Sequence, residues 1–96
     1  MNQELAQIDL YLNEDSHRLE MNIEGHIAYV EYEIKPDYWE LTHTLVPEEL
    51  AGRGVGKVLA EKVFSYLEAN NRKVKVYCPF LIKYLSKNPE WKKVTI

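Results

Sequence analysis

The sequence has little of the residue types that define several classes of protein. A single cysteine, Cys78, excludes an internal disulfide and any cysteine-rich zinc site. The three histidines, His17, His26 and His43, have neither HxxxH nor HExxH spacing, so we expect no metal ion. No apolar run has the length that a transmembrane helix needs, and the first residues do not resemble a signal peptide. We therefore expect a cytoplasmic protein that does not bind membranes.

Charge of one sign is also scarce. The 96 residues carry a formal net charge of −3 and the sequence pI is about 5.6, so we expect no basic surface for nucleic acid. With 46% hydrophobic and 28% charged residues, the composition is that of an ordinary globular domain. No repeat, linker or low-complexity tract divides the chain. The length therefore suits one domain, residues 1–96.

The first half of the chain alternates apolar and polar residues with a period of two, which is typical of half-buried strands. This pattern predicts four strands, at residues 8–12, 19–23, 28–34 and 38–46. Short turn-forming segments separate the strands, so we expect an antiparallel meander. In the fourth strand we expect the odd-numbered residues from Trp39 to Leu45, His43 among them, to share one face.

The second half changes to a helical period. Apolar residues over 55–67 form one stripe of an amphipathic helix, and Asn70-Asn71 suits its left-handed end. A fifth strand at 74–78 follows this helical crossover, which usually delivers a parallel neighbour. A second helix is predicted over 79–88, because proline suits a first turn. Residues 91–96 are expected to form a short strand or a packing segment.

Three alternating glycines, Gly52, Gly54 and Gly56, lie between the fourth strand and the first helix. Such spacing lets the backbone turn sharply and present its N–H groups to a ligand. The helix that follows begins with unpaired N–H donors and a partial positive charge, which favours an anion, most often a phosphate. The segment is not a Walker loop, since Val58 follows Lys57, and it lacks the third glycine of a dinucleotide fingerprint. A glycine-rich turn that only joins a strand to a helix is the alternative.

This segment resembles the pyrophosphate loop of the GCN5-related N-acetyltransferases, written Q/R-x-x-G-x-G/A. Residues 51–56 occupy the six positions, and Ala51 stands where Gln or Arg is usual. The resemblance implies acetyl-CoA or CoA as cosubstrate, with no metal. The residues it implies in cofactor binding are Leu45, Val46, Ala51, Gly52, Arg53, Gly54, Val55, Gly56 and Lys57.

The predicted order ββββαβα is the order of that family's core. The resemblance implies an α+β fold (of the α/β three-layer type) with a mostly antiparallel sheet, in which strands four and five run parallel and splay apart. In this family pantetheine lies in the gap between the two strands. The splay requires a defect near the end of strand four, and Val46-Pro47 is the expected place.

Several segments narrow the resemblance to the very small, single-domain members of the family. The segments are Thr42 to Leu50, the glycines, Cys78-Pro79-Phe80, Asn88-Pro89 and Trp91. In those proteins a histidine on strand four and a cysteine after strand five face the acetyl end of acetyl-CoA, which implies His43 and Cys78 here. Many larger relatives have a tyrosine on the next helix that protonates the departing thiolate, and Tyr84 falls at about that position.

The chemistry needs a neutral amine, a polarised carbonyl and a protonated leaving group. Histidine is the only one of the three residue types that titrates near neutrality, so His43 is the natural base. A backbone N–H of strand four can polarise the carbonyl. Cys78 has two possible roles: it donates a proton to the CoA sulfur, or it accepts the acetyl group as a thiolate activated by His43.

Each candidate also has a purely structural explanation. His43 would be a core histidine whose hydrogen bonds are satisfied, Cys78 a small buried hydrophobic residue, and Tyr84 a tyrosine that packs on its helix. Two functions therefore stay open: an acetyl-CoA-dependent N-acetyltransferase, and a non-catalytic CoA-binding or protein-interaction module. No segment inserted between the first strands builds a lid. We therefore expect an exposed primary amine as acceptor, such as a protein lysine or a polyamine, and a monomer or weak dimer.

Overall fold

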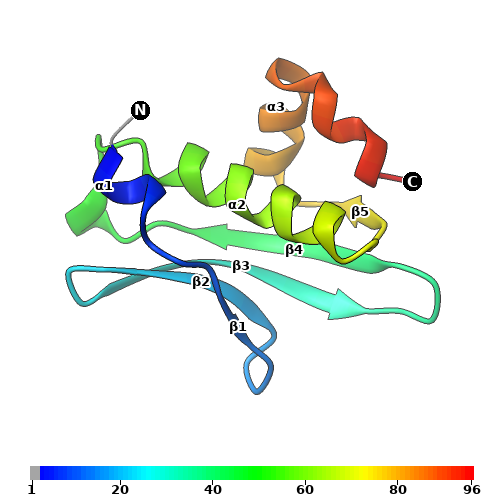
Figure 1. Ribbon diagram of the computed structural model, residues 1–96, viewed down its shortest axis with the longest axis horizontal. Coiled ribbons are helices and arrows are strands. Elements are labelled where there is room, and N and C mark those ends of the chain that lie inside the picture. The colour runs from blue at the N-terminus through cyan, green and yellow to red at the C-terminus, as the bar shows by residue number, and fades with distance from the viewer. Residues whose placement is uncertain (1–2) are drawn as a thin grey trace.

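A computed structural model describes residues 3–96, which form a five-stranded sheet with helices packed against it (Figure 1). The elements in chain order are α1 (Gln3–Ala6), β1 (Tyr11–Asn13), β2 (Arg18–Ile23), β3 (His26–Ile34), β4 (Trp39–Leu45), the 3₁₀ helix η1 (Glu48–Leu50), α2 (Val55–Ala69), β5 (Val74–Val76), α3 (Pro79–Lys87) and the 3₁₀ helix η2 (Pro89–Val94). The strands lie in the order β1-β2-β3-β4-β5, antiparallel up to β4 and parallel between β4 and β5. This arrangement confirms the predicted α+β class, the meander and the parallel crossover.

The N-terminal end of the described chain differs from the predicted elements, whereas residues 91–96 pack against the core as one of the two predicted alternatives. The first strand begins at Tyr11, and the short helix α1 buries Leu5 where no helix was predicted. Ile8 and Leu10 pack beside the core without joining the sheet, because β1 pairs with β2 only over three residues. At the other end, the chain forms η2 and then pairs Thr95 with β5 in an isolated bridge.

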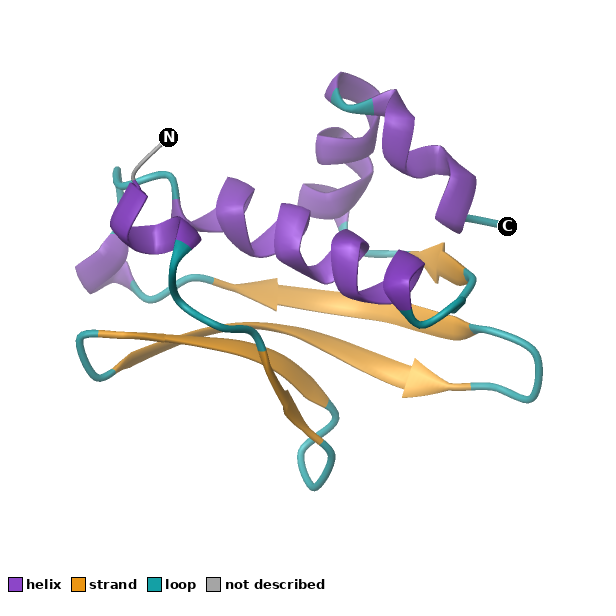
Figure 2. Cartoon of the chain, in the orientation of Figure 1, coloured by secondary structure: helices purple, strands orange, loops and turns teal. Residues whose placement is uncertain are grey.

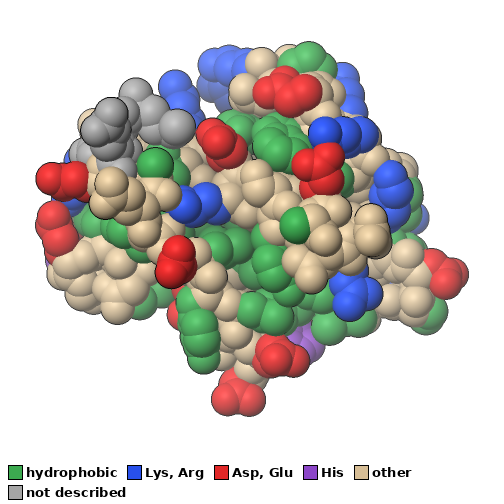
Figure 3. Space-filling model, viewed as in Figure 1, with side chains coloured by type: hydrophobic (Ala, Val, Ile, Leu, Met, Phe, Trp, Pro, Cys, Tyr) green, Lys and Arg blue, Asp and Glu red, His purple; other side chains and the backbone are tan. Residues whose placement is uncertain are grey.

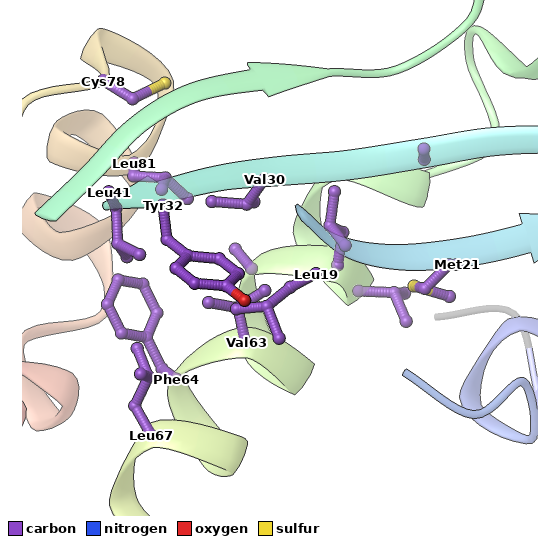
Figure 4. Close-up of a cluster of buried hydrophobic side chains, with 14 of the residues drawn as sticks. Leu19, Met21, Val30, Tyr32, Leu41, Val63, Phe64, Leu67, Cys78 and Leu81 are labelled. Carbon is purple, nitrogen blue, oxygen red and sulfur yellow. The ribbon is translucent and has the colours of Figure 1, made fainter. Parts of the chain in front are cut away.

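One face of the sheet packs against α2, as the cartoon in Figure 2 makes clear. Alternate residues of β2 and β3 point into this layer, and their side chains are almost fully buried. Figure 4 shows Tyr32 of β3 at the centre of the core, against side chains of α2. The labelled members of this cluster are Leu19, Met21, Val30, Tyr32, Leu41, Val63, Phe64, Leu67, Cys78 and Leu81. The opposite face, which carries Glu20, Tyr29 and Glu31, is half exposed, and we call it the open face.

Helices α2 and α3 begin and end where the sequence signals predict. Helix α2 follows Gly54 and stops before Asn71, whose φ of 54° is left-handed. The N–H groups of Asn71 and Arg72 donate to carbonyls of the last helical turn. Pro79 is the first residue of α3. None of the helices within residues 3–96 combines the length and apolarity that crossing a membrane requires.

A β-bulge interrupts the pairing of β3 with β4. Glu31 pairs with His43, but the next residue, Tyr32, pairs with Leu41. Thr42 is therefore an extra residue on β4, and its hydroxyl donates to the carbonyl of Glu31 at 3.4 Å. An extra residue in one strand reverses the alternation of side chains beyond it.

The bulge decides which face each residue of β4 occupies. Leu41 lies before the bulge and is fully buried under α2. Beyond the bulge, Thr44 is opposite the buried Val30 and so lies on the same covered face. His43 and Leu45 consequently lie on the open face, and both are exposed.

Two expectations about the fourth strand are thus wrong for the same reason. The odd-numbered residues from Trp39 to Leu45 do not share one face, because the extra residue Thr42 breaks the period of two. The backbone defect expected at Val46-Pro47 lies earlier, at Thr42. A threonine in a strand-like run gives no sign of a bulge, because threonine suits a regular strand equally well.

Candidate functional site

The glycine turn, residues 51–57, connects η1 to α2. Gly52 and Gly54 adopt φ values of 78° and 76°, which residues with a side chain rarely adopt. The N–H of Ala51 donates to Glu48, whereas those of residues 52–54 have no backbone acceptor within residues 3–96. The first bond at the start of α2 runs from the Val58 N–H to the Gly54 carbonyl at 3.2 Å. The turn therefore offers a run of unpaired donors at the positive end of a helix, which fits a diphosphate.

Gly56 has a second reason to be glycine. A Cβ at this position would lie 2.8 Å from Cζ of Phe80, the second residue of α3. The missing side chain thus lets the Phe80 ring lie on the first turn of α2. The structure gives this glycine a packing role between the two helices in addition to the predicted cofactor contact.

A groove of about 530 Å³ runs between α2 and α3, next to the glycine turn. It is lined by Lys57, Glu61, Phe80, Lys83, Tyr84, Lys87 and Asn88. Three lysines against one glutamate make the groove basic. None of these lysines forms an ion pair within the described part of the chain. Acidic and basic side chains are otherwise interspersed over the face in Figure 3, so this local excess is what favours an anion.

The side chain of Arg53 already binds another side chain, so it is not available for a ligand alone. Its Nη1 and Nη2 donate to the two carboxylate oxygens of Glu24 at 3.1 and 3.2 Å. The hydrogen bond and the charge of Arg53 hold the pKa of the Glu24 carboxyl below its ordinary value. The same pair raises the pKa of Arg53. The predicted cofactor contact of Arg53 thus competes with an existing bidentate partner.

The pairing of β4 with β5 ends before β4 itself does. β4 and β5 pair from Trp39 to Leu41, and the last bond between them runs from the Tyr77 N–H to the Leu41 carbonyl at 2.9 Å. Residues 42–45 continue β4 beyond this point, and within residues 3–96 no strand pairs with them on that side. This free edge leads toward the glycine turn and can pair with the amides of an extended ligand.

Cys78 lies where β5 gives way to α3. It is the residue before the helix, 4% exposed, and its thiol donates to the hydroxyl oxygen of Thr44 at 3.2 Å. This contact joins the start of α3 to the covered face of β4. The sequence reasoning did not single out Thr44, although its place directly after the candidate His43 was the available signal.

His43 lies on the open face, among side chains of β2 and β3. Its ring is 6.4 Å from that of Tyr29, between ring centroids, and its cross-strand partner is Glu31. Arg18 lies over Tyr29 at 4.0 Å, with its Nε 3.7 Å from the Glu31 carboxylate. His43 and Cys78 are therefore on opposite faces of the sheet. The predicted activation of the Cys78 thiolate by His43 does not agree with this geometry.

Tyr84 occupies a third environment. Its ring stacks on Phe64 of α2 at 5.9 Å between centroids, with 7° between the ring planes. Burial raises the pKa of the Tyr84 hydroxyl, and a hydrogen bond with Trp91 partly opposes that rise. This tyrosine lines the basic groove. The structure does not bring it together with His43 and Cys78 in one cluster.

A hollow of about 360 Å³ lies beside the bulge. It is lined by Asp15, Ser16, His17, Glu31, Tyr32, Glu33 and Thr42. Of its three carboxylates, that of Glu31 belongs to the residue opposite His43 in the sheet, and Thr42 precedes His43 in the chain. No group of three or more histidine, cysteine or acidic side chains within residues 3–96 has an arrangement that could hold a metal ion.

Together these features are typical of a class of protein in which an anion-binding turn at a helix N-terminus lies beside a parallel strand pair that comes apart. A sequence profile described as GCN5-related N-acetyl-transferase matches residues 18–94. The chain belongs to this family, whose members generally use acetyl-CoA.

Relatives and solved structures agree with this assignment. The chain is 34% identical over 50 residues to Protein NATD1 from Xenopus tropicalis and Homo sapiens, which is 52% of this chain and 46% and 44% of those proteins. The match therefore spans slightly less than half the length of these relatives. The solution structure of a GCN5-like protein from Staphylococcus aureus superimposes with a TM-score of 0.70 and 25% identity, covering 93% of this chain and 88% of that one.

Proposed function

We propose that this protein binds acetyl-CoA and transfers its acetyl group to an exposed primary amine. The observation that carries the proposal is the run of unpaired N–H groups in the glycine turn, placed beside the free edge of β4. Acetyl-CoA supplies the acetyl thioester. The donors of residues 52–57 receive its diphosphate, and residues 43–46 pair with the extended arm that follows.

The basic groove supports a specific role for three lysines. Lys57, Lys83 and Lys87 line one groove next to the diphosphate site, so we assign them to the remaining phosphate of the nucleotide. Dephospho-CoA, which lacks that phosphate, should then bind more weakly than CoA in calorimetry. Equal affinity for the two ligands would contradict the assignment of the three lysines and leave the glycine turn as the proposed anion site.

The opposite placement of His43 and Cys78 supports direct attack by the amine. In this mechanism His43 accepts the proton of the incoming amine on the open face, and a backbone N–H of β4 stabilises the carbonyl oxygen. In this proposal the thiol of Cys78, on the covered side, donates its proton to the departing sulfur. An acetyl-cysteine intermediate would need a base for Cys78, and His43 faces away from it.

The acceptor is proposed to be cationic. The carboxylates of Asp15, Glu31 and Glu33 surround the hollow beside His43, and they suit an amine whose neighbours also carry positive charge. Protein lysines and polyamines meet this description. We further propose a cytoplasmic location, where acetyl-CoA and such amines occur together.

A second function is favoured by a specific observation. The three candidate catalytic residues, His43, Cys78 and Tyr84, lie in three separate environments. This separation is expected if the gap between β4 and β5 binds CoA without catalysis. In that case the chain is a CoA-binding or protein-interaction module.

Three measurements separate the alternatives. Calorimetry with CoA and acetyl-CoA tests both CoA-dependent functions, and absence of binding at high micromolar ligand would contradict both and leave only a protein-interaction module. Thiol release with a panel of amines tests catalysis, and binding without turnover would favour the module. Mass spectrometry after incubation with acetyl-CoA alone tests the covalent route, and acetylated Cys78 would contradict direct attack.

A further inference from the structure

The glycine turn has few bonds of its own to hold its shape. Among residues 52–54, none donates its N–H to a backbone carbonyl within residues 3–96, and two are glycines with positive φ. Such a segment has many accessible conformations, and ordering it costs conformational entropy. Its donors can converge on a diphosphate only if another part of the molecule fixes the turn.

The side chain of Arg53 supplies a fixed contact at the middle of the turn. Both terminal guanidinium nitrogens bind Glu24, at 3.1 and 3.2 Å, across 29 residues of sequence. A bidentate pair defines orientation as well as distance, because the guanidinium and the carboxylate are both planar. The pair therefore ties the backbone of the turn to the β2–β3 hairpin.

The hairpin end that carries Glu24 is itself tightly constrained. Glu24 and Gly25 have φ values of 56° and 86°, and they join β2 to β3 as a two-residue turn. The N–H of Gly25 also donates to the side chain of Asn22 at 3.0 Å. A second contact runs from His26 to Glu49 of η1, with Nδ1 and Oε1 3.9 Å apart. The hairpin thus contacts this part of the chain at two points, Glu49 before the turn and Arg53 within it.

We propose that Glu24, through Arg53, is a positioning residue that holds the glycine turn in the shape that receives the diphosphate of CoA. This inference rests on the proposed function, since it assumes that the turn binds CoA. It differs from a direct role of Arg53 as a phosphate ligand, and the two roles predict opposite effects. If Glu24 only occupied Arg53, removing the carboxylate would free the cation and tighten binding.

The test compares Glu24→Gln, Arg53→Lys and the charge-swapped double variant Glu24→Arg/Arg53→Glu by calorimetry with CoA. Exposed ion pairs have modest effects, so each single change should raise the Kd for CoA by about three- to fivefold. The double variant restores the ion pair but places a carboxylate in the turn that receives the diphosphate, so it should recover the order of the turn and not the CoA affinity. In turnover, the KM for acetyl-CoA should rise while kcat stays constant. Glu68→Gln, which breaks the ion pair with Lys93 at the far end of α2, is the matched control and should change neither value.

A second measurement needs no ligand. The NMR order parameters of the backbone N–H groups of residues 52–54 should be lower in Glu24→Gln than in the wild type, with those of α3 unchanged. Tighter CoA binding in Glu24→Gln, or unchanged affinity together with unchanged order parameters, would overturn the proposal. If the wild type does not bind CoA, the proposed function fails, and the order parameters alone decide whether Glu24 holds the turn.

Discussion

At the scale of single residues, the site depends on side chains that lie on two different faces of one sheet. His43 is exposed on the open face, whereas Cys78 is buried on the other side in contact with Thr44. An amine arriving from solvent can therefore reach the histidine without displacing the core. The thiol, by contrast, belongs to a residue that is only 4% exposed.

We predict that His43→Gln lowers kcat by about 100-fold, which is the lower range for loss of a general base. The Kd for CoA should be unchanged, because residue 43 contributes only backbone groups to the proposed CoA contact. Thiol release and calorimetry measure the two effects, with Glu68→Gln as the control. Turnover equal to the wild type would exclude His43 as the base.

A second prediction concerns pH and the pair Glu24–Arg53. Arg53 lowers the pKa of Glu24 in the folded state below its ordinary value of 4.5. The unfolded chain then binds more protons in this range, so the stabilisation is present above pH 4.5 and is lost as pH falls through the lower folded value. Denaturation of the wild type and Glu24→Gln should differ near neutral pH and converge in acid. A difference that stays constant down to acid pH would contradict this linkage.

At the scale of elements, the two ends of α2 have the same backbone requirement for different reasons. Gly54 at the start has φ of 76° and Asn71 after the end has φ of 54°. The first lies in the proposed anion site, whereas the second ends the helix. Glycine adopts this region without strain, and asparagine is one of the few other residues that tolerate it.

We predict that Gly54→Ala destabilises the fold by about 1 kcal/mol, because alanine is strained in the left-handed region. The same change should weaken CoA binding, since it alters the direction of the donors in the turn. Asn71→Gly is the matched control at the other end of α2, where we expect equal or slightly higher stability and unchanged CoA affinity. Urea denaturation and calorimetry measure both properties, and full CoA affinity in Gly54→Ala would argue against the turn as the anion site.

At the scale of the whole molecule, one aromatic residue connects the separate parts of the helical layer. Phe64 of α2 is fully buried and stacks on Tyr84 of α3 and on Trp91 of η2, at 5.9 and 6.2 Å between ring centroids. The groove between α2 and α3 therefore depends on this contact for its width. Loss of the ring would affect the fold and the groove together.

We predict that Phe64→Ala destabilises the protein by about 3–5 kcal/mol, the range for removing a buried phenylalanine. That loss is a large fraction of the roughly 5–15 kcal/mol available to a domain of this kind. Phe64→Leu keeps most of the volume and should cost less than about 1.5 kcal/mol. Chemical denaturation compares the three proteins. A small effect of Phe64→Ala would mean that neighbouring side chains fill the space.

Much of this architecture was determined by the sequence alone. The alternation of residues 19–23 and 28–34, the stripe of α2 and the signals at Asn70-Asn71 and Pro79 are local patterns, and each element formed where its pattern predicted. The alternating glycines likewise implied the anion site, because positive φ and unpaired helix donors are properties of the backbone itself. Order and spacing of these pieces were enough to indicate the family.

Only the tertiary structure decided how the candidate residues relate to one another. The bulge at Thr42 turned His43 to the open face, and no residue in that strand signals it, because bulges depend on pairing with a neighbouring strand. The contact of Cys78 with Thr44 and the pair Arg53–Glu24 likewise join segments far apart in the chain. Such contacts depend on how whole elements pack, and local sequence carries no record of that packing.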